Sequence, residues 1–262
     1  MLSQTRQFFT DRNILEVDTN LLTDHPAIDC HISSISTSHG HLITSPELAM
    51  KTLLSQGIGD IYQISHVFRA SEYGTWHNPE FTMIEYYRHN ISFTTFIQET
   101  ATLLQLFLGP LPLHTLTYKD AFLTHLDIDP FTAPISTLQK LAPISPSPRD
   151  TYLDYLLSHH IEPHLGLNNL TAITDYPPSQ AALAKIQNNT AQRFEIYHQG
   201  RELCNGYNEL TDPDEYTTRN LPHNDTFHSL LSTLPPCCGV AIGFDRLLAL
   251  RNTTTLASIL PD

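Results

Sequence analysis

The stretch that organises the chain is His66 to Arg88, which reads HVFRASEYGTWHNPEFTMIEYYR. Two runs of alternating character, Ile61 to Arg69 and Glu80 to Arg88, predict a pair of β-strands. The loop between them carries His77 and Asn78. The sequence therefore predicts an antiparallel hairpin that gathers an arginine, an imidazole, an aromatic ring and several carboxylates.

One face of the second strand has the composition of a ligand site. Side chains two apart on a strand share a face. The residues that share this face are Phe81, Met83, Glu85 and Tyr87. The flat ring of Phe81 suits a nucleotide base, and Arg69 and His77 suit phosphates. Glu85 suits a cationic substrate. A purely structural hairpin with a charged turn is the alternative explanation of the same pattern.

The run HNPEFTMIEYY, residues 77–87, resembles motif 2 of the class II aminoacyl-tRNA synthetases in its lysyl-type form. The resemblance implies an α+β fold, the class II catalytic core, in which a mainly antiparallel β-sheet is flanked by helices. It also implies an enzyme that uses ATP to activate an amino acid as an adenylate, with Mg²⁺ bound through the ATP phosphates.

Length, composition and charge restrict the class of protein. We expect one catalytic domain over residues 1–262, with a helical and loop insertion at about 110–165. The sequence has no apolar run long enough to span a bilayer and no signal peptide. Four cysteines without a CxxC pair predict a reduced, cytoplasmic protein. The net charge of −13, with only 14 Lys and Arg, argues against tRNA as a partner.

The N-terminal segment resembles motif 1 of the same family, which builds the dimer interface there, so the resemblance implies a homodimer. Residues 2–12 predict a helix whose inward side chains are Leu2, Phe8 and Phe9. A short strand is predicted at 14–18, and an alternating run at 28–32 predicts a half-buried strand. Asn20 stands where the family usually has proline. Motif 1 opens the chain, so no anticodon-binding domain is expected ahead of it.

The segment TSPELAMK, residues 44–51, opens the next predicted helix. Ser45 can cap this helix, Pro46 suits its first position, Glu47 complements its dipole, and Gly57 ends it. The segment also resembles the lysyl-type TSPE sequence, whose glutamate holds the substrate amino group. The resemblance therefore implies that Ser45 and Glu47 line the substrate site.

The middle of the chain predicts core and surface without functional residues. Apolar residues recur at helical spacing from Phe93 to Phe107. Further helices are predicted at 119–126, 135–142 and 150–160, and a strand begins at Leu170. The proline-rich segment 142–149 is interpreted as a surface loop, and the histidines at 159, 160 and 164 as surface residues that lack metal-ligand spacing.

A second hairpin is predicted around a turn at Gln199-Gly200. Glu195 precedes the turn and Glu202 follows it, and paired carboxylates at facing strand ends suit Mg²⁺ held through ATP phosphates. The residues that share one face by parity are Asn205, Tyr207 and Glu209. Glu202 has the opposite parity, so a bulge or an edge position is required. The segment ELCNGYNEL, residues 202–210, resembles the lysyl-type E-x-x-NG[FY]-x-EL.

The segment CGVAIGFDRLLAL, residues 238–250, resembles motif 3, a glycine-punctuated strand that runs into a helix. Gly239 and Gly243 permit a nucleotide to approach the backbone closely. Arg246 carries a planar guanidinium that can stack and donate several hydrogen bonds. The resemblance implies that Arg246 contacts adenine and the γ-phosphate.

The resemblance assigns roles at the matching positions. Arg69 and Arg246 are the catalytic residues, which stabilise charge while the substrate carboxylate attacks the ATP α-phosphate in line. The implied ATP-binding residues are Arg69, Ser71, Glu72, His77, Asn78, Phe81, Glu202, Leu203, Gly243 and Arg246. The implied substrate-binding residues are Ser45, Glu47, Glu85, Tyr87, Asn205, Tyr207, Glu209 and Ala241. The implied Mg²⁺ ligands are Glu195 and Glu202. Ser71 replaces a family glutamate, and Glu72 is the adjacent substitute.

Within the family, the chain resembles the free-standing lysyl-tRNA synthetase paralogues that adenylate (R)-β-lysine and transfer it to a lysine of elongation factor P. Ala241 supports this resemblance, because lysyl-tRNA synthetases have glycine there. One methyl group in a pocket changes substrate discrimination by about 1–3 kcal/mol. A truncated lysyl-tRNA synthetase or a free lysine-adenylating paralogue is the alternative enzyme. A non-catalytic synthetase-like regulator is the alternative of another class.

Overall fold

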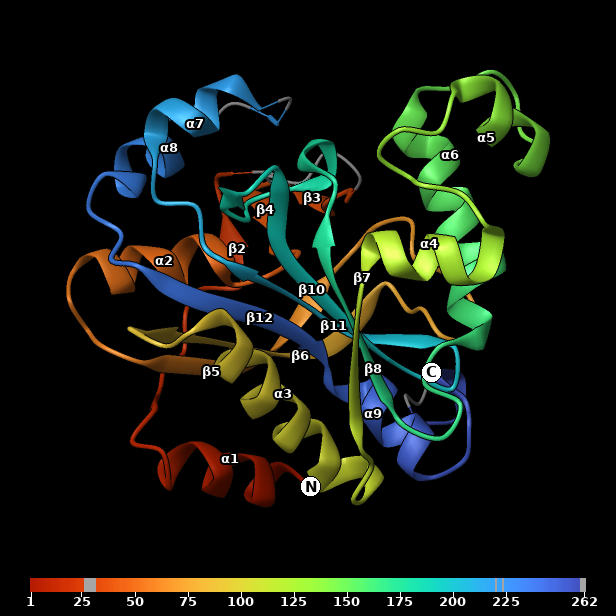
Figure 1. Cartoon of the computed structure of the whole chain (residues 1–262). Helices are drawn as coiled ribbons and strands as arrows, with labels where there is room; N and C mark the ends of the chain where they lie inside the picture. The colour runs from red at the N-terminus through yellow and green to blue at the C-terminus, as the bar shows by residue number, and fades with distance from the viewer. Residues whose placement is uncertain (26–31, 220, 223, 260–262) are drawn as a thin grey trace. The chain divides into compact units, whose positions relative to one another are not determined.

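The computed structural model describes residues 1–25, 32–219, 221–222 and 224–259, which form two compact units. The first unit comprises Met1–Pro110 and Asn208–Asp262, and the second comprises Leu111–Tyr207. Each unit combines β-strands with helices (Figure 1). The predicted half-buried strand at 28–32 lies almost wholly outside the described residues.

The main sheet of the first unit contains the predicted hairpin. Its strands are, in order, β1 (Leu15–Glu16), β5 (Ile61–Phe68), β6 (Glu80–His89) and β12 (Cys237–Gly243). β1 is parallel to β5, whereas β5, β6 and β12 are antiparallel. Val67 pairs with Phe81 in the β5–β6 hairpin, which confirms the predicted strands. A small antiparallel sheet holds β2 (Leu22–Thr23), β4 (Gly40–Leu42) and β3 (Ser36–Thr37).

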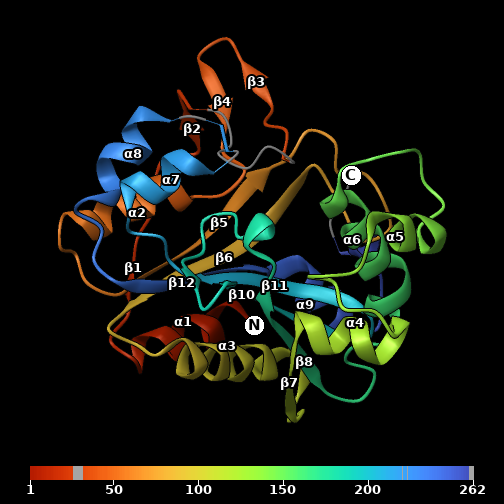
Figure 2. The same cartoon turned by 45° about the horizontal axis from the view of Figure 1, so that its top comes forward.

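The helices of the first unit are α1 (Leu2–Thr10), α2 (Glu47–Ser55), α3 (Phe93–Leu108), α7 (Pro213–Thr218), α8 (Asp225–Leu231) and α9 (Phe244–Arg251), with a 3₁₀ turn at Leu256–Ser258. α1 and α3 lie side by side (Figures 1 and 2). Phe9 of α1 stacks on Tyr62 with ring centroids 4.0 Å apart. Phe8 and Phe9 are buried as predicted, but Leu2 is 42% exposed, because the first turn of α1 extends beyond this core.

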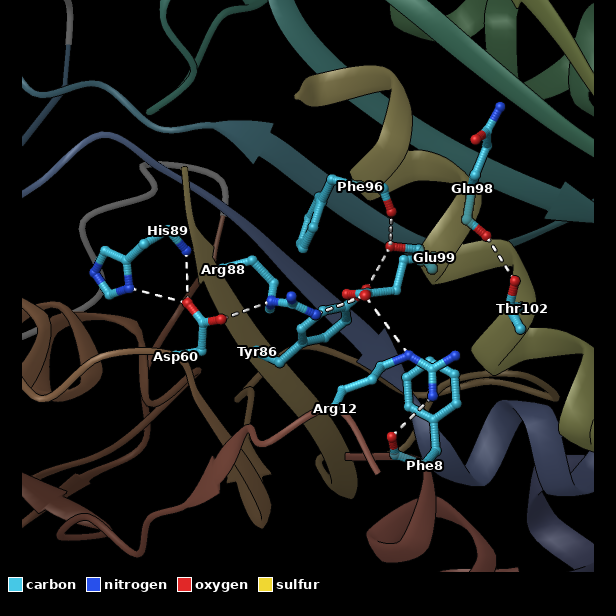
Figure 3. A network of polar contacts seen from close by, with 11 residues as sticks. Phe8, Arg12, Asp60, Tyr86, Arg88, His89, Phe96, Gln98, Glu99 and Thr102 are labelled. Atoms are coloured by element: carbon cyan, nitrogen blue, oxygen red, sulfur yellow. Dashed lines mark hydrogen bonds and ion pairs between the residues drawn. The ribbon is translucent and has the colours of Figure 1, made fainter. Parts of the chain in front are cut away.

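A network of charged groups joins these elements at one end of the hairpin (Figure 3). Arg88 of β6 contacts Asp60 at 2.8 Å and Glu99 of α3 at 2.6 Å. Arg12, just after α1, lies 3.6 Å from the same Glu99 carboxylate. Asp60 also accepts a hydrogen bond from the backbone N–H of His89. The network therefore ties α1 and α3 to the ends of β5 and β6.

The second unit has a sheet in the order β7 (Leu113–Thr117), β8 (Leu170–Tyr176), β10 (Thr190–His198), β11 (Arg201–Asn208), with β9 (Ile186–Gln187) on β10. β7 and β8 are parallel, and the other pairs are antiparallel. Its helices are α4 (Tyr118–Leu126), α5 (Ile135–Leu141) and α6 (Arg149–Leu156), followed by a π-helix (Leu157–Ile161) and 3₁₀ turns at Glu162–His164 and Pro178–Gln180. Tyr118, Phe122, Tyr152 and Tyr176 share its buried core.

Both units pair a mainly antiparallel sheet with helices, which confirms the predicted α+β class. The predicted short helices at 119–126, 135–142 and 150–160 correspond to α4, α5 and α6 with its π-helical extension. The strand β7 was missed, because residues 110–165 were interpreted as helix and loop only. No helix in the described part of the chain has the length and apolarity that crossing a membrane requires.

Candidate active site

A buried acidic cluster lies on the β6 wall of the first unit. Tyr87 donates a hydrogen bond to Glu85 Oε1 at 2.6 Å, and Ser45 donates to Glu85 Oε2 at 2.7 Å. Ser45 Oγ also accepts the backbone N–H of Glu47 at 3.0 Å. Pro46 is the N-cap of α2, so the helix begins one residue later than predicted. One hydroxyl thus joins the start of α2 to the carboxylate of β6.

The same cluster contains a lysine that the sequence analysis did not single out. Lys51 of α2 is fully buried, and its Nζ lies 2.6 Å from Glu47 Oε1 and 2.6 Å from Glu209 Oε2. The sequence does contain a signal for this lysine, because Glu47 and Lys51 are four residues apart on one helix and residues at that spacing can form an ion pair. We call the set Glu47, Lys51, Glu85, Tyr87 and Glu209 the ammonium cluster.

Burial dominates the electrostatics of this cluster. Burial raises the pKa of Glu85 to about 7, helped by repulsion from Glu47 and opposed by the hydrogen bonds from Tyr87 and Ser45. Burial likewise raises the pKa of Glu209 to about 8, although Lys51 opposes this shift. Carboxylates that are buried together in this way bind an added cation favourably, because the cation replaces bound protons.

The strand β12 pairs with β6 next to these carboxylates. Gly239 pairs with Tyr87, and Ala241 pairs with Glu85, so Ala241 shares a face with the cluster as predicted. A Cβ on Gly239 would lie 2.3 Å from the Tyr87 ring and 2.4 Å from Glu209 Oε1. Glycine is therefore required at residue 239, because the two side chains pack directly on its backbone.

Arg69 lies at the end of β5, close to Phe81. Its guanidinium carbon is 5.2 Å from the Phe81 ring centroid, and Nη1 contacts Glu72 Oε1 at 3.1 Å. Nε donates to the carbonyl of Thr44 at 3.4 Å, next to Ser45 of the cluster wall. The half-buried ring of Phe81 can stack on an aromatic base, and the guanidinium of Arg69 beside it can pair with phosphates.

The loop between β5 and β6 carries the other predicted nucleotide contacts. Gly74 and His77 form a backbone bridge, and the His77 residue is exposed. Asn78 donates from Nδ2 to the carbonyl of Glu80 at 2.7 Å. Arg246 of α9 reaches the carbonyl of Trp76 at 3.5 Å, so it lies at this loop. Ser71 is exposed, whereas Glu72 is held by Arg69.

The second unit brings together the remaining predicted residues. Glu195 pairs with Asn205, whereas Tyr197 pairs with Glu202, so Leu203 is an extra residue in β11. This register shift confirms the bulge that the parity of Glu202 required. Directly paired residues share a face, and the face contains Arg193, Glu195, Tyr197, Glu202, Asn205 and Tyr207.

Glu195 is held firmly on this face. Its Oε1 accepts Arg193 Nη2 at 2.5 Å, and its Oε2 accepts the hydroxyls of Tyr176, at 2.8 Å, and Tyr197. Arg193 also donates to Asn205 Oδ1 at 3.2 Å. Carboxylates that bind metals are themselves commonly hydrogen-bonded, and Mg²⁺ takes few protein carboxylates together with substrate phosphates. Glu195 and Glu202 therefore lie on one face of the β10–β11 pair, as the predicted Mg²⁺ site requires.

The structure thus groups the predicted residues within each unit. Ser45, Glu47, Glu85, Tyr87, Glu209 and Ala241 lie together in the first unit, and Glu195, Glu202, Asn205 and Tyr207 lie together in the second. Leu203 is buried as the bulge residue. Gly243 pairs with Met83, two residues from Phe81 along β6. Among the described residues, no three His, Cys, Asp or Glu side chains form a metal-binding group, and Cys204, Cys237 and Cys238 are free thiols.

Comparison with known proteins connects these features to one family. A sequence model of class II tRNA synthetases of the D, K and N type matches residues 1–259. The chain is 38% identical to an elongation factor P–(R)-β-lysine ligase of Hamiltonella defensa, over 99% of this chain and 91% of that protein. It is 39% identical to the ligase of the same name from Histophilus somni strain 2336, over 95% and 88%. Identity to the Salmonella typhi ligase is 38%, over 99% and 91%.

Proposed function

Because the chain belongs to the class II tRNA synthetases of the D, K and N type, we propose that it activates (R)-β-lysine with ATP and transfers it to elongation factor P. The acceptor is the side-chain amine of a lysine of that factor. The names of the relatives that align over almost the whole chain support this acceptor and this amino acid. A role in modifying a translation factor fits a cytoplasmic location.

The observation that carries the proposal is the buried ammonium cluster. Three carboxylates, Glu47, Glu85 and Glu209, face one fixed lysine, which leaves a net charge of −2 when all are ionised. A diamino acid brings two ammonium groups, which balance this charge. The carboxylate of the diamino acid can then pair with Arg69, whose guanidinium donates to the carbonyl of Thr44, the residue before Ser45. A buried site of this charge is unsuited to a neutral or acidic side chain.

The first half-reaction forms the adenylate. A carboxylate oxygen of the amino acid bonds to the α-phosphorus, the bond from that phosphorus to the bridging oxygen breaks, and pyrophosphate leaves. Arg69 stabilises the charge that develops on the α-phosphate, Phe81 stacks on adenine, and Arg246 holds the nucleotide from α9. His77 and Asn78 contribute contacts from the loop. A Mg²⁺ held by Glu195 and Glu202 supplies charge neutralisation of the phosphates when bound.

The second half-reaction moves the acyl group. The unprotonated acceptor amine attacks the acyl carbon, the bond to the AMP oxygen breaks, and the amine nitrogen releases one of its two protons as the amide forms. The ammonium cluster keeps the substrate's own amines protonated and bound, so they do not compete as nucleophiles. Asn205 and Tyr207, linked by a hydrogen bond of 2.9 Å, complete the substrate contacts in this proposal.

The proposal extends to assembly. Residues 1–262 act as one catalytic domain that contains both compact units and the insertion at about 110–165. The protein is proposed to be a homodimer through its N-terminal segment, as motif 1 implies. With a net charge of −13, the chain is poorly suited to a long phosphate backbone, so tRNA is not the proposed acceptor.

The direct test is ATP–pyrophosphate exchange with (R)-β-lysine and with α-lysine, followed by mass spectrometry of elongation factor P. We expect faster exchange with (R)-β-lysine and a gain of one β-lysyl group on the factor. Arg69→Ala should reduce exchange by about 10²–10³-fold, the scale of removing one charge-stabilising group. Lys140→Ala, an exposed residue of α5, is the control and should have no effect.

Three outcomes would contradict the proposal. Transfer of α-lysine to tRNA at high rate would identify a truncated lysyl-tRNA synthetase. Exchange with α-lysine but transfer to neither acceptor would identify a free lysine-adenylating enzyme. No exchange with either amino acid, in a folded protein that still binds ATP, would favour a non-catalytic regulator.

A further inference from the structure

The ammonium cluster contains its own buried cation. The side chain of Lys51 is 0% exposed, and it enters the cluster from the middle of α2, one helical turn after Glu47. Its Nζ bridges Glu47 and Glu209 at 2.6 Å each. The rings of Tyr87 and Phe227 face the same ammonium, with centroids at 5.9 and 5.3 Å.

This lysine connects separate parts of the fold. Glu47 belongs to α2, Glu209 follows β11, and the Phe227 ring comes from α8. The titratable groups that face Lys51 from these elements and from β6 and β12 are Glu47, Glu85, Tyr87, Glu209 and Cys237. Burial lowers the pKa of Lys51, but the ion pairs with Glu209 and Glu47 outweigh burial, so the pKa is raised and the ammonium stays charged.

The other members of the cluster need such a cation. Burial raises the pKa of the Glu209 carboxyl group to about 8, and Lys51 opposes this rise, so the pKa would lie higher still without this cation. A protonated carboxyl forms no ion pair with a substrate ammonium. Glu47 is a quarter exposed and is the partner of Lys51 that faces solvent most. Lys51 therefore orients two carboxylates at once and favours the ionised form of Glu209.

We propose that Lys51 is a positioning residue of the active site, whose ammonium bridges Glu47 and Glu209 and orients both carboxylates toward the ammonium groups of the substrate. The role toward the substrate rests on the proposed function, whereas the ion pairs of Lys51 with Glu47 and Glu209 do not. Lys51 does not touch the reacting atoms. It acts through the two carboxylates that it bridges.

The kinetic test compares Lys51→Met and Lys51→Arg with the wild type in amino-acid-dependent ATP–pyrophosphate exchange. Lys51→Met should raise the KM for the amino acid by about tenfold or more and leave the KM for ATP within about twofold. The pH of half-maximal kcat/KM for the amino acid should move up by about one to three units, because an opposite charge at this distance shifts a carboxyl by that amount.

Two variants separate this role from packing alone. Lys51→Arg keeps the charge and should keep the pH midpoint of the wild type even if its longer side chain raises the KM. Lys119→Met makes the same substitution at an exposed ion pair with Asp129, 2.8 Å long, and should change nothing. A folded Lys51→Met with the wild-type pH midpoint and the wild-type amino-acid KM would overturn the proposal. An equal loss toward ATP and amino acid would also overturn it.

A substrate-free test covers the case in which Lys51→Met folds poorly. Removing one partner of a buried ion pair is strongly destabilising, and removing both is much less so. Thermal unfolding of Lys51→Met, Glu209→Gln and the double variant at pH 7 should therefore show that the double variant is more stable than Lys51→Met. A double variant as unstable as Lys51→Met would contradict the pairing. This result is independent of which amino acid the enzyme activates.

Discussion

At the scale of single residues, burial gives ordinary glutamates unusual proton affinity. Glu85 and Glu209 are each 2% exposed, and their carboxyl pKa values lie at about 7 and about 8. The sequence predicted Glu85 and Glu209 as ligands of a cation from strand parity and motif resemblance. It did not predict Lys51, because parity along a strand carries no information about which helical side chain reaches into the same space.

The raised pKa of Glu85 predicts how stability depends on pH. Between about pH 4.5 and 7 the unfolded chain has released this proton while the folded chain keeps it. The unfolded state therefore binds fewer protons, and the free energy of unfolding falls as pH rises, by about 1.4 kcal/mol per pH unit for one proton. Glu85→Gln should reduce this slope in urea unfolding of the ligand-free protein between pH 5 and 7.

The same experiment has a control on the same strand. Glu80 of β6 is exposed and its carboxylate pairs with the exposed His66, so Glu80→Gln should leave the slope unchanged. Glu209 keeps its own shifted pKa in both variants, so Glu85→Gln should reduce the slope without removing it. An identical slope for Glu85→Gln and the wild type would show that Glu85 is ionised in the folded protein throughout this range.

Ala241 offers a second prediction at the residue scale. It lies directly across from Glu85 in the β6–β12 pairing, so its methyl group borders the proposed site of the substrate ammonium. Ala241→Gly removes that methyl group, and we expect the ratio of kcat/KM values to shift toward α-lysine by about 5–150-fold, or about 1–3 kcal/mol. The measurement is pyrophosphate exchange with both amino acids. An unchanged ratio would remove Ala241 from the determinants of specificity.

At the scale of helices and strands, the sequence predicted those elements that depend on residues close together in the chain. The β5–β6 hairpin, the helix α3 with its glycine C-cap at Gly109, and the bulge in β11 all follow from alternation, spacing and parity. The strand β7 does not, because its five residues, LHTLT, become a strand only by pairing with β8 more than fifty residues later. A partner so distant in sequence leaves no local signal.

The charged network at the end of the β5–β6 hairpin predicts how a single substitution in it changes the free energy of unfolding. Glu99 is the acceptor for Arg88, and it also lies near Arg12 (Figure 3). Its side chain is only 13% exposed, so Glu99→Gln leaves a half-buried guanidinium with a weaker partner. We expect a loss of about 1–3 kcal/mol in the free energy of unfolding. Glu80→Gln, at an exposed pair, should cost less than about 1 kcal/mol in the same urea titration.

At the scale of the whole molecule, the sequence predicted the class and the order of motifs, and the two compact units emerged only from the folded chain. The contacts within residues 111–207 include a core of their own, with Tyr118, Phe122 and Tyr152. The sequence predicts the helices of residues 110–165 but no strand there, and the structure adds β7. The ammonium cluster belongs to the first unit, and Glu195, Glu202 and Asn205 belong to the second.

The proposed homodimer gives the last prediction. Large apolar side chains remain exposed along the N-terminal segment, with Leu2 at 42%, Leu15 at 52% and Leu22 at 42%. Exposed apolar residues on α1, β1 and β2 of one N-terminal segment suit burial against a second copy of this segment. The molar mass of the wild-type protein from analytical ultracentrifugation should therefore be about twice the 29.6 kDa of one chain. Leu15→Asp should lower this mass toward that of one chain. Leu167→Asp, at a residue of the second unit that is 57% exposed, should not. If both variants sediment like the wild type at twice the chain mass, the dimer uses another surface, and a monomeric wild type would contradict the homodimer itself.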